Sequence, residues 1–232
     1  MKNTTIWMIT LLLVSLIATG AMAASPEWVA VKTDTPPTIN ADFSDEAWQS
    51  ANEFVLDKAL VETAGTVIWR GGAPTQLNNS GRFYLLWDQD FLYLYAKVQD
   101  HDVFTGRELG QPLNNGTDGL QIVMHPTTVR WIIDITPGQL NEDTPLMWEH
   151  WQVLGNILDV DVASKITEEG YEIEVAFPWS LFNATEQIKA GYQFPFGMII
   201  QEHQDNYLMM DFGQGDRVIG NASRWNTLTL GE

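Results

Sequence analysis

The sequence predicts an all-β protein: a single antiparallel β-sandwich, of the jelly-roll or immunoglobulin-like kind, with one or two short helices. Segments in which apolar and polar residues alternate recur along the chain, aromatic residues make up 11% of it, and helical patterns are rare. Aromatic residues fit the pleated, half-buried surface of a strand. Many short strands with few helices favour two packed sheets.

Residues 1–23 have the pattern of a signal peptide. Lys2 supplies a positive end, residues 6–17 are mostly apolar, and Ala21-Met22-Ala23 matches an A-x-A cleavage site. The apolar stretch is shorter than the ~20 residues that a membrane span needs. We therefore expect cleavage near Ala23, a secreted or periplasmic protein without a membrane span, and a mature chain of residues 24–232.

Strand patterns continue through residues 24–232 without a break in composition, so we expect one domain. The apolar run 83–87, the turn Asp88-Gln89-Asp90 and the alternating segment 91–99 predict a central hairpin. Further strands are expected at residues 28–32, 66–70, 120–125, 129–135, 158–162, 171–175, 196–202, 207–212 and 225–230.

Two short helices and three long loops complete the expected domain. Ser44 is the expected cap of a helix over residues 45–48, and Pro178 is expected to start a single turn that ends at Phe182. The predicted long loops are residues 71–80, 103–117 and 137–147, and loops of this length often carry function.

The chain is strongly acidic and has no cysteine. It contains 30 Asp and Glu against 12 Lys and Arg, which gives a net charge of −18. Such a surface repels phosphate backbones and anionic lipids, so nucleic acid is excluded as a partner. Stability has to come from the core, because no disulfide is available. The sequence does not fix the oligomeric state.

Five stretches in a fixed order resemble the family-9 carbohydrate-binding module, taken broadly with its secreted relatives. The resemblance spans roughly residues 36–230, and Asn40-Ala41 replaces the family's usual Asp-Gly. It implies a β-sandwich, non-catalytic binding of a poly- or oligosaccharide, and structural calcium. The matching stretches are 37–41 with 45–48, 86–88 with 92–94 and 98–100, 117–122, 169–174 with 177–179, and 225–230.

The same resemblance implies a sugar site. Gln121 falls where the family has a sugar-bonding Glu, Gln201 where it has a Gln, and Arg130 near its binding Arg. The family's two clamping Trp residues are missing, because Asn115 stands at the first position and residues 218–221 contain no aromatic side chain.

Other Trp residues are expected either in the site or in the core. Trp148 and Trp151, together with Trp131, are candidates to replace the missing stacking surfaces, because aromatic rings pack on the C–H faces of sugars. The alternative for Trp148 and Trp151 is that they pack the preceding loop onto the sandwich. The Trp residues expected in the core are Trp48, Trp87, Trp179 and Trp225.

Asp100, Asp102 and Asp118 form the candidate calcium cluster, since calcium is bound by several carboxylate and carbonyl oxygens. Asp88 and Asp90 form a second candidate, with a turn held by Asp side chains as the alternative. No organic cofactor is expected.

Three other functions stay open. A b-type haem domain would use Met124 with a distant His. A glycoside hydrolase would need a pair of carboxylates, but Glu172 and Glu174, which alternate along one strand, have the pattern of an ordinary solvent face. A surface interaction domain would use its acidic face against a basic protein. The chain has no G-x-S-x-G, HExxH or P-loop motif, so an enzyme is not expected.

Overall fold

The protein is seen here as a computed structural model. It describes residues 27–57, 68–69, 79–105, 118–128, 131–141, 144–149, 155–156, 160–202, 207–211 and 225–232. The predicted signal peptide and the candidates Asn115, Arg130 and Trp151 lie outside these ranges. Strands dominate the described chain, so the expectation of an all-β protein is confirmed.

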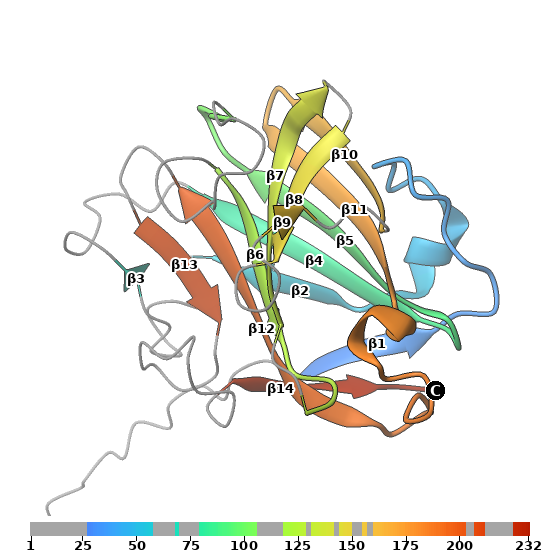
Figure 1. Ribbon diagram of the computed structural model, residues 1–232. Coiled ribbons are helices and arrows are strands. Elements are labelled where there is room, and N and C mark those ends of the chain that lie inside the picture. Colours follow the sequence, from blue (N-terminus) through green and yellow to red (C-terminus); the bar gives the residue numbers. More distant parts are fainter. Residues whose placement is uncertain are drawn as a thin grey trace, which may run out of the picture.

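The strands form two groups, which we call the first and the second sheet (Figure 1). The order in the first sheet is β14 (Asn226–Leu230), β12 (Gln193–Glu202), β6 (Gly119–Met124), β7 (Trp131–Asn141), β8 (Thr144–Glu149) and β9 (Gly155–Asn156), while β13 (Tyr207–Asp211) pairs with both β12 and β3 (Ile68–Trp69). The order in the second sheet is β10 (Asp161–Thr167), β11 (Gly170–Pro178), β5 (Phe91–Gln99) and β4 (Ser80–Trp87), with β2 (Glu53–Leu56) also paired to β4.

Strand β1 (Trp28–Lys32) connects the two sheets. Trp28 to Ala30 pair with β14, whereas Val31 and Lys32 pair with β4. Both pairings are parallel, so the expectation of a wholly antiparallel structure is wrong at β1. Parallel pairing is available there because β1 is joined to neither neighbour by a hairpin, which would force antiparallel pairing. At the far side β10 contacts β7 and β8, so the sheet path is nearly closed.

The core lies between the two sheets and is built from alternate residues of each strand. Trp28 stacks on Phe54 with ring centroids 4.4 Å apart. The four Trp residues expected in the core are all buried, and so are most apolar residues of the predicted hairpin, whereas Tyr84 and Phe91 are half-buried. Trp131, a candidate stacking surface, is instead in this core, where its ring meets Phe182 edge-on at 5.4 Å.

Two short 3-10 helices are present, as expected. Helix η2 (Trp179–Phe182) follows Pro178. Helix η1 (Glu46–Ser50) is capped by Asp45, whose carboxylate accepts a hydrogen bond from the backbone N of Ala47 at 3.0 Å. The predicted cap, Ser44, is one residue too early: its backbone N donates to Asp42 at 2.9 Å, inside the turn that precedes the helix.

The expected loop at residues 137–147 is largely a hairpin. Strand β7 continues to Asn141, and β8 begins at Thr144 and pairs back onto it. The pairing shifts register between Thr136 and Asn141, and this irregularity accommodates Pro137 and Gly138, as a bulge does. Within the described ranges, no helix is long and apolar enough to cross a membrane.

Candidate functional site

The candidate site lies on the outer face of the first sheet. Leu120 and Ile122 point into the core, so Gln121, between them on β6, points to the other side of the sheet. The same alternation places Asp134 of β7 and Gln201 of β12 on this outer face, because their neighbours Ile133, Ile135 and Ile200 are core residues. Three strands therefore bring polar side chains to one face.

Gln121, Asp134 and Gln201 form an amide–carboxylate cluster. Gln121 stands directly opposite Asp134 in the β6–β7 pairing, and its Nε2 donates to Asp134 Oδ1 at 2.6 Å. The Nε2 of Gln201 donates to the same oxygen at 3.4 Å. Both amides thus turn their NH₂ groups toward the carboxylate, which fixes their orientation.

The position of Trp148 belongs to the same row. In the β7–β8 pairing Trp148 stands opposite Asp134, so the row across the strands is Ile199, Gln121, Asp134 and Trp148. Residues opposite one another on neighbouring strands occupy the same face of a sheet. The structure therefore places three sequence candidates together: Gln121, Gln201 and the backbone position of Trp148.

Two buried polar atoms of this face have no hydrogen-bond partner within the part of the chain that the structure describes. They are Oε1 of Gln121 and Oγ1 of Thr136, two residues beyond Asp134 on β7. A buried acceptor without a partner costs about 1–3 kcal/mol. A ligand that carries hydroxyl groups could donate to Gln121 Oε1 and remove this cost. Ile132, Val123 and Ile199 supply the apolar surface around these atoms.

The cluster is covered rather than open to solvent. Gln121 is 4% exposed, Gln201 3% and Asp134 0%. The two Gln residues are therefore not ordinary solvent-facing side chains.

Asp134 was missed in the sequence. The signal was present, because Trp131-Ile132-Ile133-Asp134-Ile135 is an apolar strand with one acid in it. Acids are rarely buried in full unless they are paired. An acid inside an apolar strand should therefore have been counted as a site candidate.

Comparison with solved structures shows which known fold the chain resembles. No family model matches the chain, and no curated protein matches its sequence. A family-9 carbohydrate-binding module from Caldicellulosiruptor kristjanssonii, in complex with cellotriose, is similar over 89% of this chain and 94% of its own, with a TM-score of 0.62 and 14% identity. Its complex with glucose matches at a TM-score of 0.62 and 14% identity, over 88% of this chain and 96% of that one.

A third solved structure agrees with these two. It is a candidate carbohydrate-binding protein from Bacteroides uniformis, with a TM-score of 0.57 and 11% identity, and the match covers 89% of this chain and 100% of that one. The chain has a family-9-like fold. The resemblance of the five sequence stretches is thereby confirmed at the level of the fold.

The calcium cluster expected of a family-9-like protein is not assembled from the described carboxylates. Asp100 Oδ1 accepts from the backbone N of Asp102 at 3.0 Å, and Asp118 Oδ2 accepts from the backbone N of Phe104 at 2.5 Å. Within the described ranges, no three His, Cys, Asp or Glu residues are grouped to hold a metal ion. Among the described residues, Asp100 Oδ2 is a buried oxygen with no hydrogen-bond partner.

The second calcium candidate is a turn. Asp88 Oδ1 accepts from the backbone N of Asp90 and of Phe91, each at 2.8 Å, and Oδ2 accepts from the hydroxyl of Tyr93 at 2.7 Å. Its carboxylate is committed to the hairpin between β4 and β5. The haem candidate Met124 is a fully buried member of the core of the family-9-like fold.

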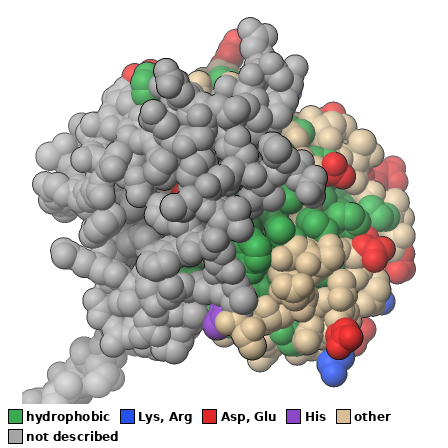
Figure 2. Space-filling view, in the orientation of Figure 1, with side chains coloured by type: hydrophobic (Ala, Val, Ile, Leu, Met, Phe, Trp, Pro, Cys, Tyr) green, Lys and Arg blue, Asp and Glu red, His purple; other side chains and the backbone are tan. Residues whose placement is uncertain are grey.

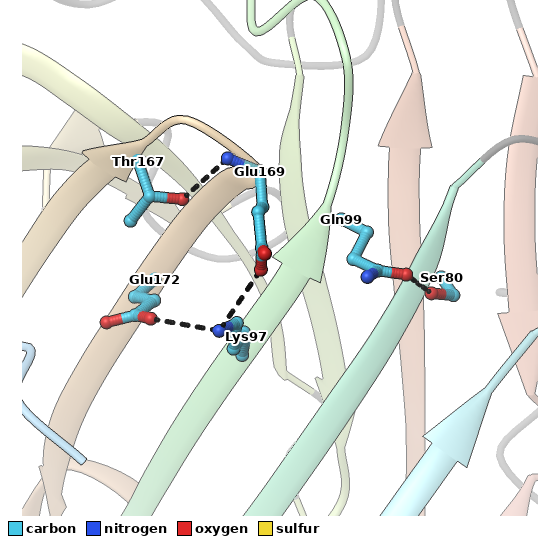
Figure 3. Close-up of polar contacts among 6 residues, drawn as sticks. All are labelled: Ser80, Lys97, Gln99, Thr167, Glu169 and Glu172. Carbon is cyan, nitrogen blue, oxygen red and sulfur yellow. Dashed lines mark hydrogen bonds and ion pairs between the residues drawn. The ribbon is translucent and has the colours of Figure 1, made fainter. Parts of the chain in front are cut away.

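The outer face of the second sheet offers a contrasting polar surface (Figure 3). Lys97 lies 3.4 Å from Glu169 and 3.8 Å from Glu172, and the hydroxyl of Ser80 donates to Gln99 at 2.8 Å. These polar groups are exposed or half-buried and pair with one another. Unlike Gln121, they gain little from a ligand, so the first sheet carries the candidate site.

Proposed function

We propose that this chain is an exported, non-catalytic saccharide-binding protein of the family-9-like fold. The observation that carries the proposal is the amide–carboxylate cluster, in which two oriented amides on one face leave Gln121 Oε1 ready to accept a hydrogen bond. The two family-9 structures with bound sugar support a saccharide as the ligand. A sugar suits such a site because it offers hydroxyls to polar groups and C–H faces to apolar ones.

The proposed site extends from the cluster to Trp148 and to three candidates outside the described residues, Asn115, Arg130 and Trp151. The carboxylate of Asp134 forms hydrogen bonds with the two amides rather than with the sugar. It accepts from both NH₂ groups, so the acceptor oxygen of Gln121 is held in place before the ligand arrives. Such preorganisation lowers the entropic cost of binding.

The cluster is tested with Gln121→Met, which keeps the volume of the side chain but removes the amide. Wild-type protein is screened by calorimetry against cellotriose, glucose and a panel of polysaccharides. Losing one buried hydrogen bond to the ligand should weaken binding by about tenfold. Gln99→Met is the matched control, since Gln99 is an exposed amide on the other sheet.

Melting temperatures of both variants establish that the fold is retained. The cluster is the wrong site if Gln121→Met, still folded, binds as tightly as Gln99→Met. The proposal as a whole is overturned if wild-type protein is retained by no glycan. Export is tested separately: the mature protein outside the cytoplasm should begin near Ala24, as read by mass spectrometry.

A further inference from the structure

Thr136 carries a buried hydroxyl that the described part of the fold does not use. The residue is 0% exposed, and its Oγ1 has no hydrogen-bond partner within the described ranges. It lies on β7 two positions beyond Asp134, and its neighbour Ile135 points into the core, so Thr136 faces outward with the amide–carboxylate cluster. A buried hydroxyl without a partner destabilises the folded state, whereas valine would fill nearly the same space without that cost.

Thr136 and Gln201 lie on either side of a glycine of β6. Ile135 pairs with Leu120, so Thr136 is the neighbour of the residue that precedes Leu120. That residue is Gly119, and a Cβ added to it would meet the Cα of Thr136 at 3.4 Å. On its other side Gly119 stands opposite Gln201 in the β6–β12 pairing. Because glycine has no side chain, no side chain of β6 separates the positions of Thr136 and Gln201.

Residue 119 has to be a glycine in this sheet. A Cβ at Gly119 would also meet the backbone O of Ile135 at 2.4 Å, and this oxygen cannot move away without disturbing the pairing of β6 with β7. The close approach of the two strands thus keeps a residue without a side chain between Thr136 and Gln201.

Gln121 and Thr136 differ in the hydrogen bonds that they can make with a ligand. The NH₂ group of Gln121 is turned toward Asp134, and the remaining polar atom, Oε1, can only accept. The hydroxyl of Thr136 can both donate and accept. A free hydroxyl group of a sugar suits both atoms, whereas an ether oxygen or a carboxylate has no hydrogen to donate to Gln121.

We propose that Thr136 is a second polar contact of the saccharide and a specificity-determining residue of the site, which takes a sugar unit with free hydroxyl groups for both Thr136 and Gln121. Binding then satisfies two buried atoms that folding leaves without partners, and the hydroxyl of Thr136 serves binding while it lowers stability. The inference rests on the proposed saccharide site and adds a residue that the resemblance to the family-9 module did not indicate.

The test compares Thr136→Val, which removes the hydroxyl, with Thr136→Ser, which keeps it. The probes are cellotriose and glucose, followed by whichever polysaccharide of the panel the wild type binds. Thr136→Val should weaken binding at least about fivefold in calorimetry, because the ligand hydroxyl loses its partner, while its melting temperature equals that of the wild type or rises. Thr136→Ser should retain the affinity and melt at a lower temperature, because it loses a buried methyl group.

Thr227→Val is the matched control and should alter neither affinity nor melting temperature. Thr227 is an exposed threonine on β14 of the same sheet, and it stands opposite Pro195, which lies about 20 Å from Gln201 along β12. The inference is overturned if Thr136→Val binds as tightly as Thr227→Val, if it no longer folds, or if Thr136→Ser loses as much affinity; the contact at Gln121 then still stands. A wild type that binds no saccharide overturns the proposed function instead.

Discussion

Glu174, on β11, is a buried carboxylate that accepts three hydrogen bonds from a distant segment of the chain. It lies two residues from Glu172 on the same face of β11 and was expected to face solvent, yet it is fully buried. Its Oε2 accepts from the backbone N of Asn40 and of Ala41 at 2.9 and 2.8 Å, and its Oε1 accepts from Trp48 Nε1 at 2.8 Å. The carboxylate thus fastens residues 40–48 onto the second sheet.

Glu174→Ala is expected to destabilise the protein strongly. It leaves three donors without their acceptor, and each buried orphan costs about 1–3 kcal/mol, so the unfolding free energy should fall by about 3 kcal/mol or more. Glu169→Ala is the control. Glu169 is exposed and pairs with Lys97, so its loss should cost less than about 1 kcal/mol. Urea denaturation measures both, and similar losses would contradict the role given to Glu174.

The pH dependence of stability provides a second measure of Glu174. Burial raises the pKa of its carboxyl above the ordinary 4.5, against the opposing effect of its three donors. The folded state therefore binds the proton more tightly than the unfolded state. The contribution of this carboxyl group to the free energy of unfolding is complete below about pH 4.5, and it is lost as the pH rises through the pKa of the folded state. Denaturation curves recorded over a series of pH values measure this dependence, and Glu174→Gln should remove the part of it that comes from this carboxyl group.

The turn between β10 and β11 depends on Gly170. Its φ is +145°, and it stands opposite Gln99 at the end of the β11–β5 pairing. A Cβ there would meet the backbone O of Val98 at 2.1 Å and the backbone N of Asp100 at 2.6 Å. Neither backbone atom can move away without breaking the pairing of the two strands.

Gly170→Ala should therefore cost about 2 kcal/mol or more of unfolding free energy, from strain and from the close contact. Gly191→Ala separates the two causes. Gly191 also has a positive φ, +81°, but no neighbouring atom lies within 4 Å of an added Cβ. Its substitution should cost only about 1 kcal/mol. Chemical denaturation measures both losses. If the two variants lose equal unfolding free energy, the contact of the added Cβ with Val98 and Asp100 is relieved and the role given to it is wrong.

Strand β1 and the net negative charge both affect the stability of the whole molecule. Since β1 pairs with strands of both sheets, neither sheet is complete without it. The net charge of −18 opposes the compact state by self-repulsion. Figure 2 shows acidic side chains gathered along one edge of the described surface, with few basic ones among them.

Calcium is proposed to stabilise this acidic fold through Asp100, whose Oδ2 is buried and has no hydrogen-bond partner among the described residues. Millimolar CaCl₂ should raise the melting temperature more than NaCl of equal ionic strength, because salt alone screens repulsion whereas a bound ion stabilises by mass action. Chelator should reverse the gain, and Asp100→Asn should abolish it. Equal effects of CaCl₂, MgCl₂ and NaCl would contradict a calcium site.

The sequence by itself determined the all-β class, the hairpin of β4 and β5, and four of the buried Trp residues. These follow from a period of two and from turn residues, which act over a few neighbouring positions. The order of the five family-9-like stretches also determined the fold, although no single stretch is specific.

Only the tertiary structure decided which strand faces are covered. Glu174 is buried because a segment more than a hundred positions earlier packs on it, and alternation along β11 carries no information about that segment. Gln121, Asp134 and Gln201 meet because the register across three strands aligns them. The resemblance to the family-9 module identified two of these three residues as candidates, but their orientation depends on Asp134, which becomes a neighbour only when the sheet forms.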